Sequence, residues 1–425
     1  MELFPGCYRK ELANDLEVIG QEEPQSKSVS LGLWFKSGSR DERPKENGIT
    51  HLIEHLLFRG TENRNAYRIT SDVDRLGGHI NGSTSREYLL LSLRLLPESL
   101  AEGLDILTDL ALNPLFRQED FKLEKDVVLE EIRSSHDDHQ SESIRLLGET
   151  IWGEDSGLSQ PVRGTEESLT ELTRDRVEKR YESVKKPGKM IITAAGDFDF
   201  EELFSLTESS LGGLASGDLT ENELDSNSPK RGNSNGSIKR DQRDINQLHC
   251  VLGVEGLAKK DEERYPLEML NVILGQGMSS RLFRKVRKEN GLAYQVTSSS
   301  KYYTDTGVFL VYGAMAPQNL NKFIELTMEE IDNLIEEPVG PRELERAKKK
   351  TKGNLVLGLE DNRSLMGRLG ITTLHGDDFL SVSEVIEEIE AVSPEDIKDV
   401  ANKLLTRDRI NYSLLGPGVE EVSPF

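Results

Sequence analysis

Two histidines four residues apart, with a glutamate between them, are the residues of this chain best suited to metal chemistry. The stretch reads His51-Leu52-Ile53-Glu54-His55. On a helix, residues four apart lie one turn above each other, so both imidazoles could bind one Zn²⁺ ion. Glu54 would lie on the same side, where a carboxylate can act as a base. Two surface histidines beside a helical salt bridge are the alternative interpretation.

The residues around the histidines predict the helix that would present them. An apolar stripe beside the histidine face is formed by Ile49, Leu52, Ile53, Leu56 and Leu57. The order H-x-x-E-H is the reverse form of the zinc-peptidase helix, in which two histidine ligands flank a catalytic glutamate. Such a site needs a third protein ligand and keeps a fourth position open for water.

A second predicted helix, over residues 121–135, carries the candidate third ligand. Its apolar face contains Phe121, Val128 and Ile132. Glu124 and Glu131 flank that face, whereas Glu130 points about 100° further round the helix. Glu131 is therefore the better inward-facing ligand, and Glu124 is better suited to supporting the ligands than to facing solvent. On this segment alone, a solvated acidic face would explain all three glutamates.

Together, the H-x-x-E-H and E-x6-E segments resemble the pitrilysin (insulysin) family of zinc peptidases. Further short segments that match the family lie at residues 48–50, 58–61, 77–81, 287, 291–294 and 305–307. The resemblance extends from about residue 16 to about residue 415. It is closest to half-length members, namely bacterial processing-protease-like enzymes and the catalytic subunit of mitochondrial processing peptidase.

The resemblance implies roles for four residues of the two helices, and the helical position of Glu124 suggests a fifth. His51, His55 and Glu131 match the zinc ligands, with one ion per chain, and Glu54 matches the general base. Glu124 joins the catalytic set as a supporting carboxylate. The implied activity is zinc-dependent endopeptidase hydrolysis of extended or unfolded peptides. A catalytically silent subunit, or one that depends on a different partner, is the alternative.

The resemblance also assigns roles in the second half of the chain. Arg287 and Tyr294 match residues that approach the substrate from the half of the chamber without zinc. Their own surroundings would otherwise indicate a surface charge and a core strand residue. Because the family builds its chamber from four such domains, two copies of this chain are expected to form a homodimer with C2 symmetry.

A glycine-led segment is the candidate peptide-binding edge. The residues are Gly78, His79, Ile80, Asn81 and Gly82, after Gly77. Two glycines favour a tight turn, and the following residues can form an edge strand that pairs with an extended peptide. The resemblance implies this use, with Asn81 contacting substrate. Gly82 replaces the alanine usual in the family, and a plain hairpin turn remains the alternative.

The pattern of elements predicts an α+β fold with two similar domains, each a mostly antiparallel sheet with helices packed on one face. Strands are expected at 29–36 and 88–96 in the first half, and at 247–254, 294–302 and 307–312 in the second, where a helix at 265–274 replaces the histidine helix. The expected boundaries are a zinc-binding domain at 1–214, a linker at 215–244 and a metal-free domain at 245–425.

Composition limits the classes of partner and location. The chain has 425 residues, 36% of them hydrophobic, and no run approaches the roughly 18 apolar residues of a membrane span. The net charge of −23 argues against nucleic acid as a partner. The same charge could attract cationic peptides or serve only solubility. Two cysteines and no recognisable signal or transit segment predict a cytoplasmic protein.

Overall fold

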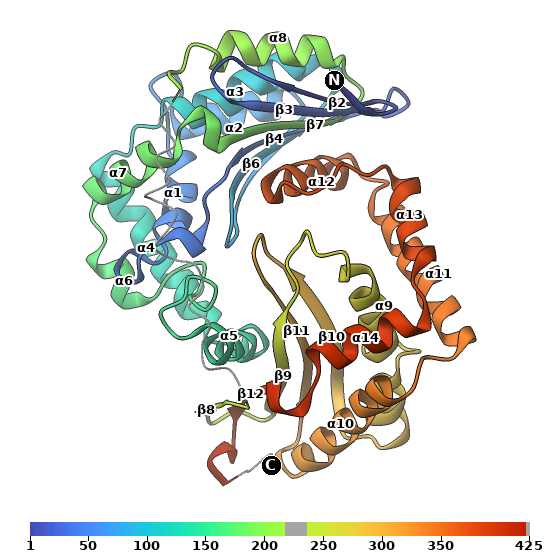
Figure 1. The fold of residues 1–425 in the computed structure, drawn as a ribbon. Coiled ribbons are helices and arrows are strands. Elements are labelled where there is room, and N and C mark those ends of the chain that lie inside the picture. Colours follow the sequence, from blue (N-terminus) through green and yellow to red (C-terminus); the bar gives the residue numbers. More distant parts are fainter. Residues whose placement is uncertain (217–235, 422–425) are drawn as a thin grey trace. The chain divides into compact units, whose positions relative to one another are not determined.

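The computed structural model describes residues 1–216 and 236–421. The chain divides into two compact units. Unit 1 comprises Met1–Ser135, Gln160–Ser228 and Gly358–Phe379, and unit 2 comprises His136–Ser159, Pro229–Leu357 and Leu380–Phe425. Each unit is built on one sheet with helices packed against it (Figure 1). No helix in the described ranges has both the length and the apolar character needed to cross a membrane.

Unit 1 contains a seven-stranded sheet in the order β1-β2-β3-β7-β4-β6-β5. The strands are β1 (Glu2–Phe4), β2 (Cys7–Glu11), β3 (Glu17–Glu22), β4 (Val29–Phe35), β5 (His79–Thr84), β6 (Leu89–Leu95) and β7 (Met190–Gly196). All neighbours are antiparallel except β3 and β7, which are parallel. Every residue of β4 is buried, because both faces of this central strand are covered.

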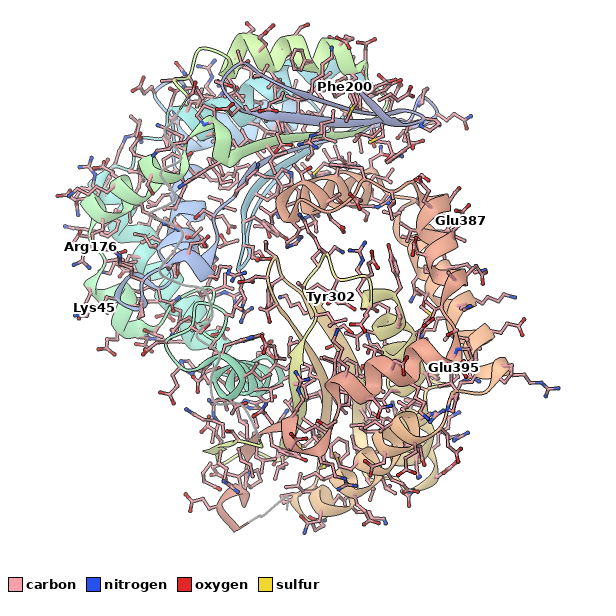
Figure 2. The ribbon with its side chains drawn as sticks, viewed as in Figure 1. Lys45, Arg176, Phe200, Tyr302, Glu387 and Glu395 are labelled. Atoms are coloured by element: carbon pink, nitrogen blue, oxygen red, sulfur yellow. The ribbon has the colours of Figure 1, made fainter. Side chains whose placement is uncertain are left out.

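One face of this sheet is covered by helices of the first half of the chain. The helices of this half within unit 1 are α1 (Ile49–Leu57), α2 (Ala66–Arg75), α3 (Leu100–Leu112), α4 (Gln118–Ser135), α6 (Glu166–Glu171), α7 (Arg174–Val184) and α8 (Phe200–Leu211). Leu31 and Leu33 of β4 point into this core, together with Leu52 of α1. Phe200 at the start of α8 packs on Tyr8 of β2, with ring centroids 5.4 Å apart (Figure 2).

The opposite face of the same sheet is covered by α12 (Asn362–His375), which comes from the second half of the chain. Met366 and Leu369 of this helix pack with Trp34 and Ile191 in a separate apolar cluster. Gly370 permits the close approach, because a Cβ atom there would lie 2.1 Å from the Trp34 ring. Figure 1 shows α12 beneath the strands β4 and β7.

Unit 2 contains a five-stranded sheet in the order β10-β11-β9-β12-β8. The strands are β8 (Ile238–Gln242), β9 (Leu248–Gly256), β10 (Ala293–Tyr302), β11 (Gly307–Met315) and β12 (Asn411–Gly416). Apart from α12, the helices described in the second half are α9 (Arg264–Leu274), a π-helix (Phe283–Glu289), α10 (Leu320–Glu336), α11 (Pro341–Gly358), α13 (Val382–Ala391) and α14 (Pro394–Leu404). In the described residues of both units, short 3₁₀ turns lie at Ser39–Asp41, Pro44–Glu46, Pro97–Ser99, Pro187–Lys189, Pro317–Asn319, Arg407–Arg409 and Val419–Glu421.

The second face of the unit 2 sheet is covered by α5 (His139–Trp152), a helix of the first half of the chain. Leu147 and Ile151 of α5 pack on Val251 and Leu310. The order β8-β12-β9-β11-β10 repeats β3-β7-β4-β6-β5, with one parallel pair at the same place in both. The predicted α+β class with two similar domains is confirmed.

The two halves of the chain exchange one helix each: α5 of the first half packs in unit 2, and α12 of the second half packs in unit 1. This exchange adds a helical layer to each sheet and changes the unit boundaries from those predicted. In each unit, helices from the same half of the chain as the sheet cover one face of that sheet, as expected. The helix from the opposite half covers the second face. Segments 136–159 and 358–379 therefore lie in the units opposite to those expected from sequence. Within the expected linker, Ile238–Gln242 is a strand, and residues 217–235 lie outside the described residues. This strand is polar because it is an edge strand beside buried β12.

Candidate metal centre

Helix α1 presents the two histidines because its other side is anchored in the core. Leu52 and Leu56 are buried, whereas His51 and His55 are only partly covered. The helix begins after Gly48, whose φ of +92° favours glycine. A Cβ atom at this position would also lie 2.4 Å from a backbone oxygen. The orientation of the histidine face is thus set by a tight turn and an apolar stripe.

A buried carboxylate holds the start of α1. Glu42 accepts hydrogen bonds from the backbone N–H groups of Gly48, at 2.7 Å, and Thr50, at 2.8 Å. The Asn47 side chain donates a third hydrogen bond to the same carboxylate, at 3.1 Å. Burial raises the pKa of Glu42 to about 7, although the hydrogen bonds from Thr50 and Gly48 act to lower it. No pattern in the sequence alone predicts this role of Glu42.

Glu131 of α4 meets both histidines of α1. His51 Nε2 lies 3.1 Å from Oε2 of Glu131, and His55 Nε2 lies 3.6 Å from Oε1. One ligand atom from each of the three residues lies within 4.8 Å of the others. Tetrahedral zinc with nitrogen and oxygen ligands at about 2.0–2.2 Å would place its ligand atoms about 3.3–3.6 Å apart. The donor types and spacing therefore fit zinc.

The neighbouring glutamates of α4 have different surroundings. Glu124 is almost fully buried, and its Oε2 lies 2.8 Å from Nδ1 of His55. Its other oxygen pairs with Arg59. Burial acts to raise the pKa of Glu124, but the hydrogen bonds from His55 and Arg59 outweigh burial and lower it. Glu130 is exposed and pairs with Arg133 instead, so it does not face the histidines.

Glu54 lies beside the cluster with its carboxylate held by β5. One oxygen accepts a hydrogen bond from the Thr84 hydroxyl and lies 3.5 Å from Nδ1 of His51. Burial acts to raise the pKa of Glu54, but the hydrogen bonds from His51 and Thr84 hold it below its ordinary value. The carboxylate is therefore ionised at neutral pH. A Cβ atom at Gly82 would lie 2.7 Å from Cγ of Glu54, so this glycine leaves room for the side chain.

The predicted peptide-binding segment forms the outer strand of the unit 1 sheet. Gly78 precedes β5 and donates its N–H to the Val73 carbonyl. Residues His79 to Gly82 pair with β6, and β5 is the end strand of the described sheet. His79 and Asn81 are exposed, whereas Ile80 packs on the main core. The segment is thus an edge strand rather than only a hairpin turn.

Arg287 and Tyr294 belong to unit 2, and the metal cluster belongs to unit 1. Arg287 lies in the π-helix Phe283–Glu289, and Tyr294 lies in β10. The guanidinium carbon of Arg287 lies 4.9 Å from the centroid of the Tyr294 ring. Tyr294 is 76% exposed, so it is not the core residue that its strand position alone would suggest.

Several residues that shape the cluster were missed in the sequence analysis. Arg59 pairs with Glu124, and Arg163 Nε lies 3.3 Å from Oε2 of Glu131. Thr84 and Glu42 were also missed. Arg59 follows His55 by four residues, so helical spacing could have indicated a supporting role. The others depend on strand register or on loop contacts that local spacing does not encode.

Two family models match the two halves of the chain. Residues 17–166 match the family model described as insulinase (peptidase family M16), and residues 171–351 match that of the peptidase M16 inactive domain. An uncharacterized zinc protease of Streptomyces coelicolor is 35% identical, covering 96% of this chain and 89% of the relative.

Solved structures share the fold. A Helicobacter pylori protease superposes with a TM-score of 0.89 at 22% identity, covering 97% of this chain and 99% of that one. A chain of complex III2 from Candida albicans superposes with a TM-score of 0.85 at 20% identity, covering 98% and 97%.

Proposed function

Because this chain belongs to the insulinase family of peptidases (peptidase family M16), we propose that it is a zinc-dependent endopeptidase acting on extended peptides. The observation that carries the proposal is the convergence of His51, His55 and Glu131 beside an ionised Glu54. The inactive-domain model spans residues 171–351, which contain none of these four residues. Its name therefore does not count against activity in the first half.

His51, His55 and Glu131 would hold the ion. Zinc in such a site supplies Lewis acidity, which lowers the pKa of water and polarises the substrate carbonyl. The Glu54 carboxylate would accept the proton of the attacking water and pass it to the leaving amine. Thr84 fixes the direction of the Glu54 carboxylate through its hydrogen bond.

The supporting residues keep the ligands in one orientation. The Glu124 carboxylate accepts a hydrogen bond from Nδ1–H of His55, which leaves the lone pair of Nε2 on the side of Glu131. Carboxylates that bind the outer nitrogen of a histidine ligand fix its tautomer and raise its basicity. The outer edge of β5 offers main-chain groups to an extended peptide, and this kind of pairing tolerates many sequences.

We also propose a homodimer in which Arg287 and Tyr294 of one copy complete the site of the other. The support is the chamber of four domains known in the family, since this chain supplies two. Mixing Glu54→Gln protein with Tyr294→Phe protein tests the idea, because mixed dimers would regain one intact site. If subunit exchange is confirmed and no activity returns, the proposal is wrong. Size measurement on the purified chain tests the dimer itself.

A cytoplasmic location is proposed from the cysteines. Cys7 and Cys250 are both free and buried, as expected where no disulfides form. Cell fractionation with an antibody against the chain tests this location, and recovery outside the cytoplasmic fraction would contradict it.

The decisive test compares wild-type and Glu54→Gln proteins for zinc content and cleavage of a mixed library of unstructured peptides. We expect about one zinc per chain in both proteins and cleavage by the wild type only. Zinc without cleavage by the wild type would favour the silent or partner-dependent subunit. Absence of zinc from both would refute the ligand assignment.

A further inference from the structure

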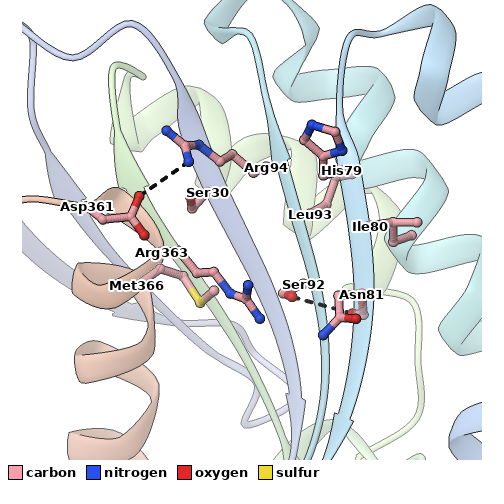
Figure 3. A pocket seen from close by; sticks show the side chains of 10 residues that line it. All are labelled: Ser30, His79, Ile80, Asn81, Ser92, Leu93, Arg94, Asp361, Arg363 and Met366. Atoms are coloured by element: carbon pink, nitrogen blue, oxygen red, sulfur yellow. Dashed lines mark hydrogen bonds and ion pairs between the residues drawn. The ribbon is translucent and has the colours of Figure 1, made fainter.

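A pocket of about 280 Å³ lies over the outer strands of unit 1. Its lining residues come from β4, β5 and β6 and from the start of α12 (Figure 3). Helix α12 packs mainly on β7, β4 and β3. The pocket therefore lies where this helix stops covering the sheet and β5 and β6 continue outward. None of the predicted metal ligands lines it.

The pocket carries an excess of positive charge. Arg94 Nη1 lies 3.5 Å from Oδ1 of Asp361, so these two charges offset each other. The guanidinium of Arg363 has no hydrogen-bond or ion-pair partner among the described residues. In Figure 3 it points from α12 toward Ser92 and Asn81. An arginine beside the Asn81 side-chain amide suits a carboxylate, which accepts hydrogen bonds from both groups. The Ser92 hydroxyl donates instead to the Asn81 backbone carbonyl, at 3.4 Å.

Strand register connects this pocket to the predicted peptide-binding edge. Asn81 is opposite Ser92, and His79 is opposite Arg94, and all four line the pocket. Gly82 and Thr84 of the same strand point to the other face, where Gly82 adjoins Glu54 and the Thr84 hydroxyl donates a hydrogen bond to the Glu54 carboxylate. Successive side chains of a strand alternate between the two faces of a sheet. A peptide paired with the outer edge of β5 would continue this alternation.

We propose that the pocket is a subsite for an acidic side chain of the extended peptide bound along β5. The proposal rests on the endopeptidase function proposed above. In a bound peptide, every second side chain would be directed toward Glu54, near the scissile bond. The alternate side chains would be directed toward the sheet face on which α12 packs. Since His79 and Asn81 precede Gly82 and Thr84, the acidic residue would lie on one side of the scissile bond, within about five residues of it.

Binding to the full-length, zinc-loaded Glu54→Gln protein tests the subsite without requiring cleavage. Dye-labelled neutral peptides would carry a single Glu, or Gln as an isosteric control, at each position in turn, and fluorescence anisotropy would give Kd. We expect Glu at one position to bind about two- to fivefold more tightly than Gln, the range of an exposed ion pair. The preference should shrink as salt is raised.

Adding Arg363→Gln should abolish the preference, and adding Arg363→Glu should make Lys the favoured residue there. Arg176→Gln is the matched control, because Arg176 is an exposed arginine of α7 outside the pocket (Figure 2). Equal binding of Glu and Gln peptides at every position, or a preference that survives Arg363→Gln, would overturn the subsite. Failure of wild-type protein to cleave any peptide would instead contradict the endopeptidase proposal, while the Kd ratios would still decide the subsite.

Discussion

Replacement of Glu124 by Gln should weaken zinc binding without removing a ligand. Glu124 lies 2.8 Å from Nδ1 of His55, and its side chain is only 4% exposed, so water cannot take its place. A hydrogen bond to a charged group contributes about 1.5–3 kcal/mol, compared with about 0.5–1.5 kcal/mol for a neutral pair. Gln keeps an acceptor for His55 but removes the charge, so the loss should be about 1.5 kcal/mol.

This loss corresponds to about a tenfold weaker zinc affinity. Glu124→Ala removes the acceptor as well and should weaken binding by up to about 100-fold, the upper range for residues that support metal ligands. The assay is competition for zinc against a chelator of known affinity at fixed pH. Unfolding of the metal-free variants by urea would show whether the fold is retained.

Glu130→Gln is the matched control, because Glu130 lies on the same helix with its side chain 73% exposed and pairs with Arg133. It should leave zinc affinity unchanged. The reasoning is refuted if Glu124→Gln binds zinc as tightly as the wild type, or if Glu130→Gln weakens binding equally.

Three further predictions concern a ligand, a buried carboxylate and a helix contact. Glu131→Gln should weaken zinc binding in the same assay by more than Glu124→Gln does, and equal losses would contradict its place as a ligand. The pKa of Glu42 is about 7 in the folded protein, against about 4.3 in the unfolded chain. Protonated Glu42 therefore stabilises the folded state fully below pH 4.3, and this stabilisation is lost as the pH rises to 7. In metal-free urea unfolding, the stability of wild type relative to Glu42→Gln should therefore fall by about 3 kcal/mol from pH 4.5 to 7.5, and a constant difference would refute this. Gly370→Ala should lower the free energy of unfolding by about 1–3 kcal/mol, because the new Cβ atom would meet Trp34. Gly367→Ala on the same helix is the control, because its Cβ atom would meet nothing within 4 Å and should not destabilise the fold. Similar melting temperatures for the two variants would contradict the contact.

The site helices could be predicted because their information is local. The apolar stripe around His51 and the helical positions of Glu124 and Glu131 follow from 3.6-residue periodicity. Glu42 could not be found this way, since it reaches the start of α1 from eight residues before Thr50 through an irregular segment. No short spacing rule describes a contact of that kind.

The exchange of α5 and α12 was not predictable for a related reason. An apolar face shows that a helix must pack, but it does not identify the sheet on which it packs. Trp34 and Gly370 meet although they are more than 300 positions apart in sequence. The strand Ile238–Gln242 was assigned to the linker because its polar residues resemble a loop, and only pairing with β12 orders it.

The position of α12 late in the chain also delays completion of unit 1 during synthesis. Among the described residues, the last helix that the first half contributes to unit 1 ends at Leu211, and α12 begins at Asn362, about 150 residues later. At the usual 5–20 residues per second, a ribosome needs about 8–30 s to make the intervening chain. During that interval the sheet face bearing Trp34 and Ile191 has no cover, and it is an expected binding surface for a chaperone.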